Sequence, residues 1–245
     1  MRAIVFDLDG VVLDTESTDF AAWKRAYREH GQVLPADRWI EAIGSDGSRF
    51  DPLLELRRRL GPALDEEAMQ RARREHRDGL IARLSALPGV VELLDQADAA
   101  GVVTAVASSS ERAWVELHLS TLGLRQRFSV LRCKEDVARV KPDPALYRTA
   151  VEALGVAPGD AVAIEDSPNG LAAARAAGLF CVAVPGPMTR GLDFSAAHLV
   201  LRSLADTSLA ALRQAHRGRT PDRSGRGTLA GRSPSEEESP CTDAS

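Results

Sequence analysis

Two aspartates separated by one residue follow a short apolar run near the beginning of the chain. The segment reads AIVFDLDG, with the acids at Asp7 and Asp9 and a glycine at position 10. Two carboxylates this close repel each other unless a cation lies between them, and hard oxygen ligands suit Mg²⁺. The glycine allows the backbone to turn after the strand, so that both acids can converge on one point. The motif therefore predicts a magnesium site at Asp7 and Asp9.

A second acidic pair ends a later apolar run. Glu165 and Asp166 follow AVAI at 161–164 and precede SPNG and a stretch of small residues over 171–177. In a parallel sheet, ligands bind outside the carboxyl ends of the strands, which meet at one edge. We expect both acidic pairs at that edge, which adds Glu165 and Asp166 to the candidate metal ligands.

Hydroxyl and ammonium groups lie between the two acidic pairs along the chain. The run over 102–107 ends in three serines at 108–110, and Lys141 lies in the segment VKPDP. Hydroxyls and backbone N–H groups at a turn from strand to helix suit phosphate oxygens, and a lysine supplies compensating positive charge. Together with the acids, Ser108, Ser109 and Lys141 predict a pocket for a phosphoryl group.

Short β-branched runs alternate with helical stretches through most of the chain. This alternation predicts an α/β fold with a Rossmann-like parallel sheet covered by helices. The expected strands cover residues 3–6, 102–107, 128–131, 161–164, 181–184 and 198–201. The two acidic pairs then follow the first and the fourth strand.

About 95 residues separate the first two expected strands, far more than a single crossover helix requires. Residues 17–85 have apolar side chains at helical spacing and no convincing strand. We assign residues 17–85 to an inserted helical cap domain, and residues 1–16 and 86–216 to the α/β core. Residues 217–245 are rich in Gly, Ser, Pro and Arg with almost nothing to bury, which predicts a disordered tail.

Composition limits the partners and the compartment. The 245 residues include 31 Lys and Arg against 35 Asp and Glu, a net charge of −4 that does not favour a nucleic-acid partner. The first acid comes too early for a signal peptide, and no apolar run approaches the ~18 residues of a membrane span. The three cysteines form no C-x-x-C pair. We expect a cytoplasmic protein without a nucleic-acid or membrane partner, and the sequence is compatible with a monomer.

The ordered set DLDGVVLDT, VASSS, KPDP and EDSPNG resembles the four motifs of the haloacid dehalogenase-like (HAD) superfamily. It is most similar to the β-phosphoglucomutase-like phosphatases, which carry a helical cap after the first motif. The resemblance spans residues 3 to about 204, and four motifs in this order are a specific signal. It implies a Mg²⁺-dependent phosphomonoester hydrolase that acts on a small phosphorylated metabolite, with a sugar phosphate expected, through an aspartyl-phosphate intermediate.

The resemblance also implies a role for each reactive residue. Asp7 would be the nucleophile that attacks phosphorus. Asp9 would protonate the leaving oxygen and then deprotonate the water that hydrolyses the intermediate. Ser108 and the backbone amide of Ser109 would hold the phosphoryl oxygens, and Lys141 would offset the charge around Asp7.

The same resemblance implies a set of metal ligands. The Asp7 carboxylate, the Asp9 backbone carbonyl and Asp166 would bind Mg²⁺. Glu165 would either be a further ligand or contact the residues that are ligands. The cation would let an anionic nucleophile approach an anionic phosphate.

A phosphosugar mutase of the β-phosphoglucomutase type is the nearest alternative. It would use both aspartates in the same roles but must retain a bisphosphate intermediate. Those mutases carry a histidine early in the first cap helix, where this chain has Asp19, and their Gly-x-Ser-Arg cap pattern is not reproduced in register by GSDGSRF at 44–50. We therefore prefer hydrolysis. Arg49 of that loop is a candidate contact for an anionic part of the substrate, with a solvated loop cation as the alternative.

Other classes of protein fit the residues less well. The dehalogenase branch lacks the second acid of the first motif, which is present here as Asp9. A non-catalytic phospho-accepting signalling domain places its aspartate after the third strand and has no cap insertion, whereas Asp7 follows the first. A catalytically silent binding protein stays open, although retention of every expected reactive group argues against it.

Overall fold

A computed structural model of the chain describes residues 1–43 and 50–218, and these residues form a six-stranded parallel sheet. The candidate Arg49 and the expected tail beyond residue 218 lie outside the described residues. The order of strands across the sheet is β3-β2-β1-β4-β5-β6. The strands are β1 (Ala3–Phe6), β2 (Val103–Ala107), β3 (Val130–Arg132), β4 (Ala161–Glu165), β5 (Phe180–Ala183) and β6 (Leu199–Val200). The predicted parallel α/β sheet is confirmed.

The register of the central strand determines where the acidic pairs lie. Phe6 pairs with Val106 of β2 on one side and with Ile164 of β4 on the other. Because all three strands run in the same direction, the residues that follow them leave the sheet at the same edge. Asp7 and Glu165 therefore lie side by side where their strands end, although they are 158 positions apart in the sequence.

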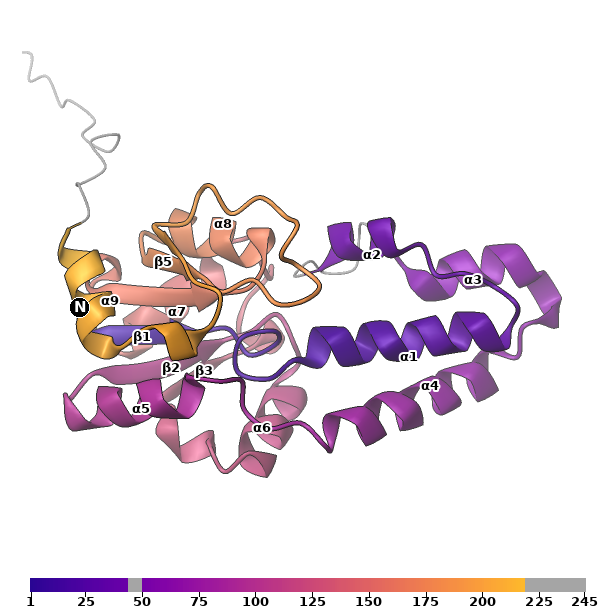
Figure 1. The fold of residues 1–245 in the computed structure, drawn as a ribbon, viewed down its shortest axis with the longest axis horizontal. Coiled ribbons are helices and arrows are strands. Elements are labelled where there is room, and N and C mark those ends of the chain that lie inside the picture. The colour runs from indigo at the N-terminus through magenta and orange to yellow at the C-terminus, as the bar shows by residue number, and fades with distance from the viewer. Residues whose placement is uncertain (44–49, 219–245) are drawn as a thin grey trace, which may run out of the picture.

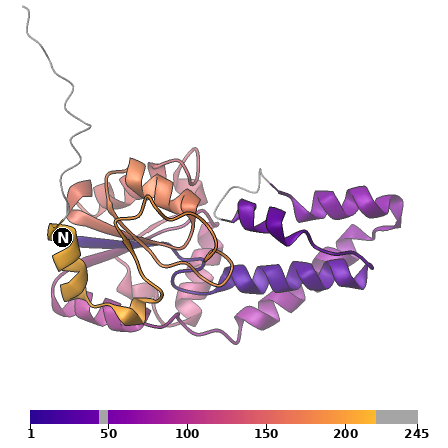
Figure 2. The same cartoon turned by 45° about the horizontal axis from the view of Figure 1, so that its top comes forward.

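Two layers of helices cover the two faces of the sheet (Figures 1 and 2). Successive residues of a strand point to opposite faces, so Ile4 and Phe6 pack on one side and Ala3 and Val5 on the other. The first side is covered by α5 (Val90–Ala99), α6 (Arg112–Thr121) and α9 (Leu209–Arg217), and the second by α7 (Ala145–Ala153) and α8 (Pro168–Ala176). Short 3-10 turns cover Gly61–Ala63, Arg125–Arg127, Lys134–Asp136, Pro158–Asp160 and Leu204–Asp206.

A helical cap projects from the carboxyl edge of the sheet, as Figure 1 shows. Its helices α1 (Thr15–Glu29), α2 (Ala36–Ala42), α3 (Pro52–Leu60) and α4 (Glu66–Ile81) all lie between β1 and β2 in the sequence. Helix α1 begins after Asp14, whose side chain accepts a hydrogen bond from the Ser17 amide, and it packs against α4. The cap has its own apolar core around Trp23, Tyr27 and Leu56. The predicted helical insertion is confirmed.

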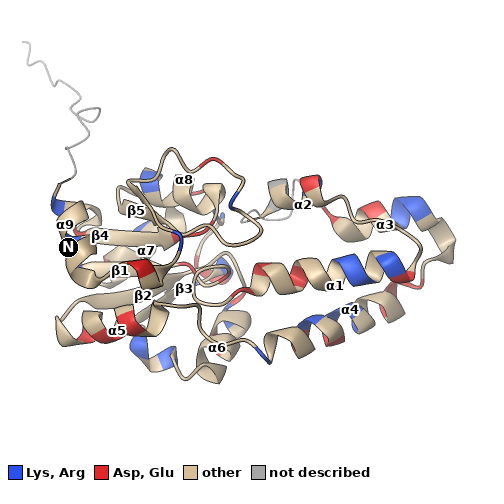
Figure 3. Cartoon of the chain, in the orientation of Figure 1, with Lys and Arg blue, Asp and Glu red and all other residues tan. Residues whose placement is uncertain are grey.

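Charged residues of both signs lie along the cap helices (Figure 3). One ion pair, between Arg73 of α4 and Asp19 of α1 at 2.8 Å, joins the two long cap helices.

Within residues 1–43 and 50–218, none of the helices combines the length and the apolar character that a membrane span needs. Cys133 and Cys181 are buried and free.

Gly89, which precedes α5, allows a close approach between two parts of the core. It has φ +88°, and a Cβ there would lie 2.1 Å from the carbonyl carbon of Leu204 and 2.2 Å from the nitrogen of Ala205. We expect Gly89→Ala to lower the free energy of unfolding by about 1–2 kcal/mol from the left-handed backbone and by a further ~1–3 kcal/mol from overpacking. Urea unfolding would measure the loss.

Gly101→Ala is the matched control for that substitution. Gly101 also has a left-handed backbone, at φ +65°, but a Cβ there would meet nothing within 4 Å. The free energy of unfolding of Gly101→Ala should therefore fall only by the contribution of the left-handed backbone. Equal losses in the two variants would show that the contact between Gly89 and the 204–205 backbone is not tight.

Candidate active site

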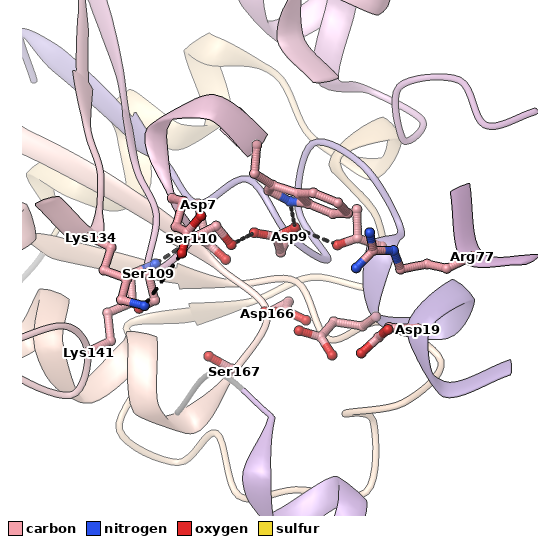
Figure 4. Close-up of a pocket in the computed structure, with 14 residues that line it drawn as sticks. Asp7, Asp9, Asp19, Arg77, Ser109, Ser110, Lys134, Lys141, Asp166 and Ser167 are labelled. Atoms are coloured by element: carbon pink, nitrogen blue, oxygen red, sulfur yellow. Dashed lines mark hydrogen bonds and ion pairs between the residues drawn. The ribbon is translucent and has the colours of Figure 1, made fainter. Parts of the chain in front are cut away.

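A cleft of about 390 Å³ lies where the cap meets the carboxyl edge of the sheet. The core contributes the residues that follow β1, β2 and β4, together with Lys141 from the loop before α7. The cap contributes Glu16 and Asp19 from α1 and Arg77 from α4. Figure 4 shows core side chains such as Asp9 and Asp166 and the cap side chain of Asp19 around a shared space. The four sequence segments predicted to meet therefore do meet.

Asp7 and Asp166 form the floor of this cleft, and a third carboxylate, Glu165, is buried beside them. One oxygen from each of Asp7, Glu165 and Asp166 lies within 4.8 Å of the others, and all three side chains are buried. The backbone is shaped to allow this, because a Cβ at Gly10 would lie 2.1 Å from Asp166 Oδ2. A compact set of oxygen donors is the kind of site that Mg²⁺ prefers. The residues present therefore fit the magnesium ion that the sequence predicted.

Lys141 links two of the three acids. Its Nζ lies 2.6 Å from Asp7 Oδ1 and 2.6 Å from Glu165 Oε1, and only 3% of its side-chain surface is exposed. The hydroxyl of Tyr147 also donates to Glu165 Oε1, and Ser167 Oγ lies 3.4 Å from Glu165 Oε2. The predicted placement of Lys141 beside Asp7 is therefore observed, and the same lysine holds Glu165 as well.

Burial and like charges dominate the electrostatics of the floor. The pKa of Asp7 is raised to about 8, chiefly by burial and also by the charges of Glu165 and Asp9, against the lowering effect of Lys141. Burial also raises the pKa of Asp166 well above its usual range. Burial alone would lower the pKa of Lys141, but the carboxylates of Asp7 and Glu165 raise it. One ammonium cannot balance three carboxylates, so the site retains a proton or binds a cation.

Asp9 lies beside this floor and is surrounded by hydrogen-bond donors. Its Oδ1 accepts from Thr15 Oγ1 at 2.7 Å and from Trp114 Nε1 at 3.0 Å. Its Oδ2 accepts from Ser110 Oγ at 2.7 Å and from Ser108 Oγ at 3.3 Å. The side chain of Asp9 is therefore held by both the core and the first residue of α1.

The three serines after β2 have different environments. Ser108 is fully buried, and its Oγ accepts from the Ser110 amide at 3.0 Å and contacts Asp9. Ser109 lines the cleft, and its buried Oγ has no hydrogen-bond partner among the described residues. Of the two serines expected to bind phosphate, only Ser109 therefore lines the cleft, while Ser108 lies behind it.

The cleft also contains residues that the sequence reading did not select. Glu16 lines it, and burial raises the pKa of this carboxyl to about 8, with Asp9 and Asp19 adding to the increase. Trp114 and Arg77 form the wall beside Asp9. An acid in the first turn of a helix is an ordinary helix-start signal, so nothing in the sequence separates Glu16 from such a role.

This geometry is that of a capped α/β enzyme that acts on phosphate esters. The sequence comparison then gives the family: the model of the haloacid dehalogenase-like hydrolases matches residues 1–178, and the chain belongs to that family. Within it the chain lies in the β-phosphoglucomutase and CbbY branch with a helical cap, and it is a phosphatase.

Several named relatives align over most of their length. The putative phosphatase YhcW of Bacillus subtilis is 39% identical over 212 residues, which cover 86% of this chain and 96% of that protein. Validoxylamine A 7'-phosphate phosphatase of Streptomyces hygroscopicus is 34% identical, over 74% of this chain and 84% of its own. The β-phosphoglucomutase of Bacillus subtilis is 32% identical, over 87% and 95%.

A solved structure shares both fold and sequence with the chain. CbbY from Rhodobacter sphaeroides in complex with phosphate has a TM-score of 0.69 and 32% identity, and the match covers 87% of this chain and 99% of that one. A variant of the same protein, in complex with xylulose-(1,5)bisphosphate, matches with the same TM-score and identity. The family resemblance expected from the four motifs is thus confirmed.

The crowded floor predicts that Mg²⁺ binding releases protons. At pH 7 an acid whose pKa is raised to about 8 is mostly protonated, and a metal ligand must be deprotonated. We expect about one proton to leave per bound ion near pH 7, and Mg²⁺ affinity to rise between about pH 6 and 8 and then level off. Calorimetry in two buffers of different ionisation enthalpy measures this release. A binding enthalpy independent of the buffer would contradict it.

A second prediction concerns the glycine behind Glu165. A Cβ at Gly170, in α8, would lie 2.0 Å from the Glu165 carboxyl group, whereas one at Gly79, in α4, would meet nothing within 4 Å. Gly170→Ala must displace Glu165, and with it Lys141, so we expect Mg²⁺ affinity to fall by about 10- to 100-fold. Gly79→Ala is the matched helical control and should bind Mg²⁺ normally. Unchanged metal binding in Gly170→Ala would contradict this prediction.

Proposed function

We propose that the protein is a Mg²⁺-dependent phosphatase that hydrolyses monoesters of small phosphorylated metabolites, sugar phosphates in particular, through phosphorylation of Asp7. The convergence of Asp7, Lys141 and Asp166 at the floor of one cleft, with Glu165 buried beside them, carries this proposal. An aspartate fixed beside a lysine and two further acids has the parts needed for covalent phosphoryl transfer.

In the first step an Asp7 carboxylate oxygen bonds to phosphorus while the bond from phosphorus to the ester oxygen breaks. The bound Mg²⁺ would supply charge that offsets the phosphate oxygens and lets the two anions approach. Lys141, held at 2.6 Å from Asp7 Oδ1, keeps that oxygen engaged and fixes the orientation of the carboxylate. Asp9 gives its proton to the departing alkoxide, which leaves as an alcohol.

In the second step Asp9 takes a proton from water, whose oxygen attacks phosphorus. The bond from phosphorus to Asp7 then breaks, and the enzyme returns to its starting state with inorganic phosphate as product. Ser109 is the proposed contact for the phosphoryl oxygens, through its backbone amide and its unpartnered Oγ. Ser108 is proposed for the same role, and its Oγ also lies 3.3 Å from Asp9 Oδ2.

Four residues are proposed for the metal site. The carboxylates of Asp7 and Asp166 and the backbone carbonyl of Asp9 would bind Mg²⁺ directly. Glu165 accepts hydrogen bonds from Lys141 and Tyr147 at one oxygen. Because those contacts occupy Glu165, its proposed role is to hold Lys141 and to add negative charge beside the ion.

The cap is proposed to select the substrate and to exclude water when it closes. Glu16 and Asp19 present acceptors for sugar hydroxyl groups on the cap side of the cleft. The CbbY variant structure contains xylulose-(1,5)bisphosphate, and a relative from Thermotoga maritima is named a phosphorylated carbohydrates phosphatase, which supports this substrate class. Arg49 keeps its proposed contact with an anionic part of the substrate. The hinges on which the cap would close are proposed near residues 14–16 and 85–88.

A phosphosugar mutase is the second candidate, because a named β-phosphoglucomutase is 32% identical over most of its length. The position where those mutases carry a histidine is occupied here by Asp19, which forms an ion pair with Arg73 at 2.8 Å. Incubation with a hexose phosphate and a trace of its bisphosphate separates the two reactions. A phosphatase releases inorganic phosphate, whereas a mutase yields the isomeric monophosphate with little release.

The nucleophile is tested by Asp7→Asn. We expect this variant to lose more than about 10³-fold of the phosphate release from 4-nitrophenyl phosphate, because its amide cannot form the covalent intermediate. Asp95→Asn is the control, since Asp95 lies on α5 in an exposed ion pair with Arg127. Wild-type activity in Asp7→Asn would reject Asp7 as the nucleophile. A panel of phosphorylated metabolites, ranked by kcat/KM, then tests the proposed preference for sugar phosphates.

A further inference from the structure

The indole of Trp114 is the core's contact with Oδ1 of Asp9, and a cap residue stacks on that same ring. Trp114 Nε1 lies 3.0 Å from Asp9 Oδ1, and the guanidinium carbon of Arg77 lies 4.8 Å from the centre of the Trp114 ring. We propose that Trp114 is a positioning residue that orients the carboxylate of Asp9 for proton transfer, and that Arg77 couples this orientation to the cap. The inference rests on the proposed function of Asp9 as acid and base.

The chemistry of the donors gives Trp114 a distinct effect on Asp9. The hydroxyls of Thr15 and Ser110 can rotate to donate or to accept, whereas the indole N–H can only donate. Oδ1, which faces Trp114, therefore remains an acceptor whether Asp9 is ionised or protonated. The transferable proton is then carried by Oδ2, where the rotating hydroxyls of Ser108 and Ser110 lie. Trp114 thus determines which oxygen of Asp9 exchanges the proton.

The surroundings of Trp114 hold its ring in place from the core side. The residue lies in the first turn of α6 and packs against the main apolar core. The ring of His118, one turn later, contacts it edge to face, with 4.1 Å between the ring centres. A donor fixed by packing loses little conformational freedom when it binds its acceptor, so its hydrogen bond can define a geometry.

Arg77 holds the opposite side of the contact and belongs to the cap. It lies on α4, and its guanidinium group also pairs with Asp78 at 2.8 Å. Figure 4 shows Asp9 between Ser110 on one side and Arg77 on the other. Stacking of a guanidinium on an indole is attractive, and Trp is the strongest aromatic partner for it. Movement of the cap away from the core would therefore remove a contact that holds the ring beside Asp9.

Trp114→Phe removes the N–H donor and keeps an aromatic ring for packing and stacking. The measurement is kcat/KM for two substrates: a sugar phosphate that the wild type hydrolyses, whose alkoxide needs a proton, and 4-nitrophenyl phosphate, whose phenolate leaves without one. Loss of one hydrogen bond to a charged acceptor should lower kcat/KM by about 10-fold for the sugar phosphate. For 4-nitrophenyl phosphate, kcat/KM should stay within about twofold of the wild-type value. This parameter reports on steps up to the first irreversible one, the departure of the phenolate, which needs no proton from Asp9.

The chain offers a matched control in Trp39, in the cap core. Its Nε1 is buried without a hydrogen-bond partner among the described residues. Trp39→Phe removes the same atoms without removing such a contact, so both substrates should be hydrolysed as by the wild type. Equal losses for the two substrates in Trp114→Phe would show a merely structural role, and no loss would show no role. Either result overturns the inference.

Asp9→Asn separates this inference from the function on which it rests. If Asp9→Asn hydrolyses the sugar phosphate normally, Asp9 is not the acid, and the proposed role of Trp114 fails with that assignment although the phosphatase activity stands. If Asp9→Asn is inactive but Trp114→Phe is normal for both substrates, only the role of Trp114 fails.

The contribution of the cap is tested by Arg77→Met in two backgrounds. In the otherwise wild-type protein we expect kcat/KM for the sugar phosphate to fall by about three- to fivefold. In the Trp114→Phe background the same change should have no further effect, because the N–H that the stacking positions is already absent. Arg74→Met, on the exposed side of α4, is the control. Independent losses in the two backgrounds would show that Arg77 acts by another route.

Discussion

Everything in the cleft depends on one buried ammonium group placed between two carboxylates. Lys141 contacts both Asp7 and Glu165 at 2.6 Å, and a third acid, Asp166, lies within 4.8 Å of the pair. Such a group of acids is unstable by itself, because burial and mutual repulsion disfavour their ionised forms. The surplus of negative charge is also what gives the site its affinity for a divalent cation, so the energetic cost of the cluster and its function have the same origin.

The parallel sheet is what brings the residues of this cluster together. The parallel register places the ends of β1 and β4 side by side, and the small residues Gly10 and Gly170 leave room for the carboxylates of Asp166 and Glu165. The helical cap leaves the core at the same edge, through α1, so that Glu16 and Asp19 line the same cleft. Residues distant in the chain thus meet because neighbouring strand ends share one edge.

The sequence was sufficient to predict the parts of the site that local patterns encode. Apolar runs that end in paired acids marked the ends of β1 and β4, and the long gap between the first two strands marked the cap. The boundaries were less accurate: β3 begins at Val130 instead of 128, because its residues pair with β2 only from that point. A local pattern indicates that a strand exists, but the partner strand determines where its ladder begins and ends.

The contacts that depend on tertiary packing could not be predicted in this way. Trp114 and Tyr147 look like ordinary apolar positions of α6 and α7, and only the fold brings their N–H and O–H groups to Asp9 and Glu165. Ser108 gives a further example. Its position after β2 predicts a phosphate contact, which stays a prediction, whereas its burial and its contact with Asp9 come from the fold. Whether a residue after a strand faces the cleft depends on a turn of the backbone that its type does not determine.

The central claim is that Asp7 receives the phosphoryl group beside the acidic cluster. A crystal structure of the protein grown with Mg²⁺ and trifluoroberyllate, which mimics a phosphoryl group on a carboxylate, tests it most directly. We expect beryllium bonded to a carboxylate oxygen of Asp7, with Mg²⁺ bound by Asp7 and Asp166 and with Lys141 still beside them. Beryllium bonded to another residue, or Mg²⁺ bound away from Asp7 and Asp166, would contradict the claim.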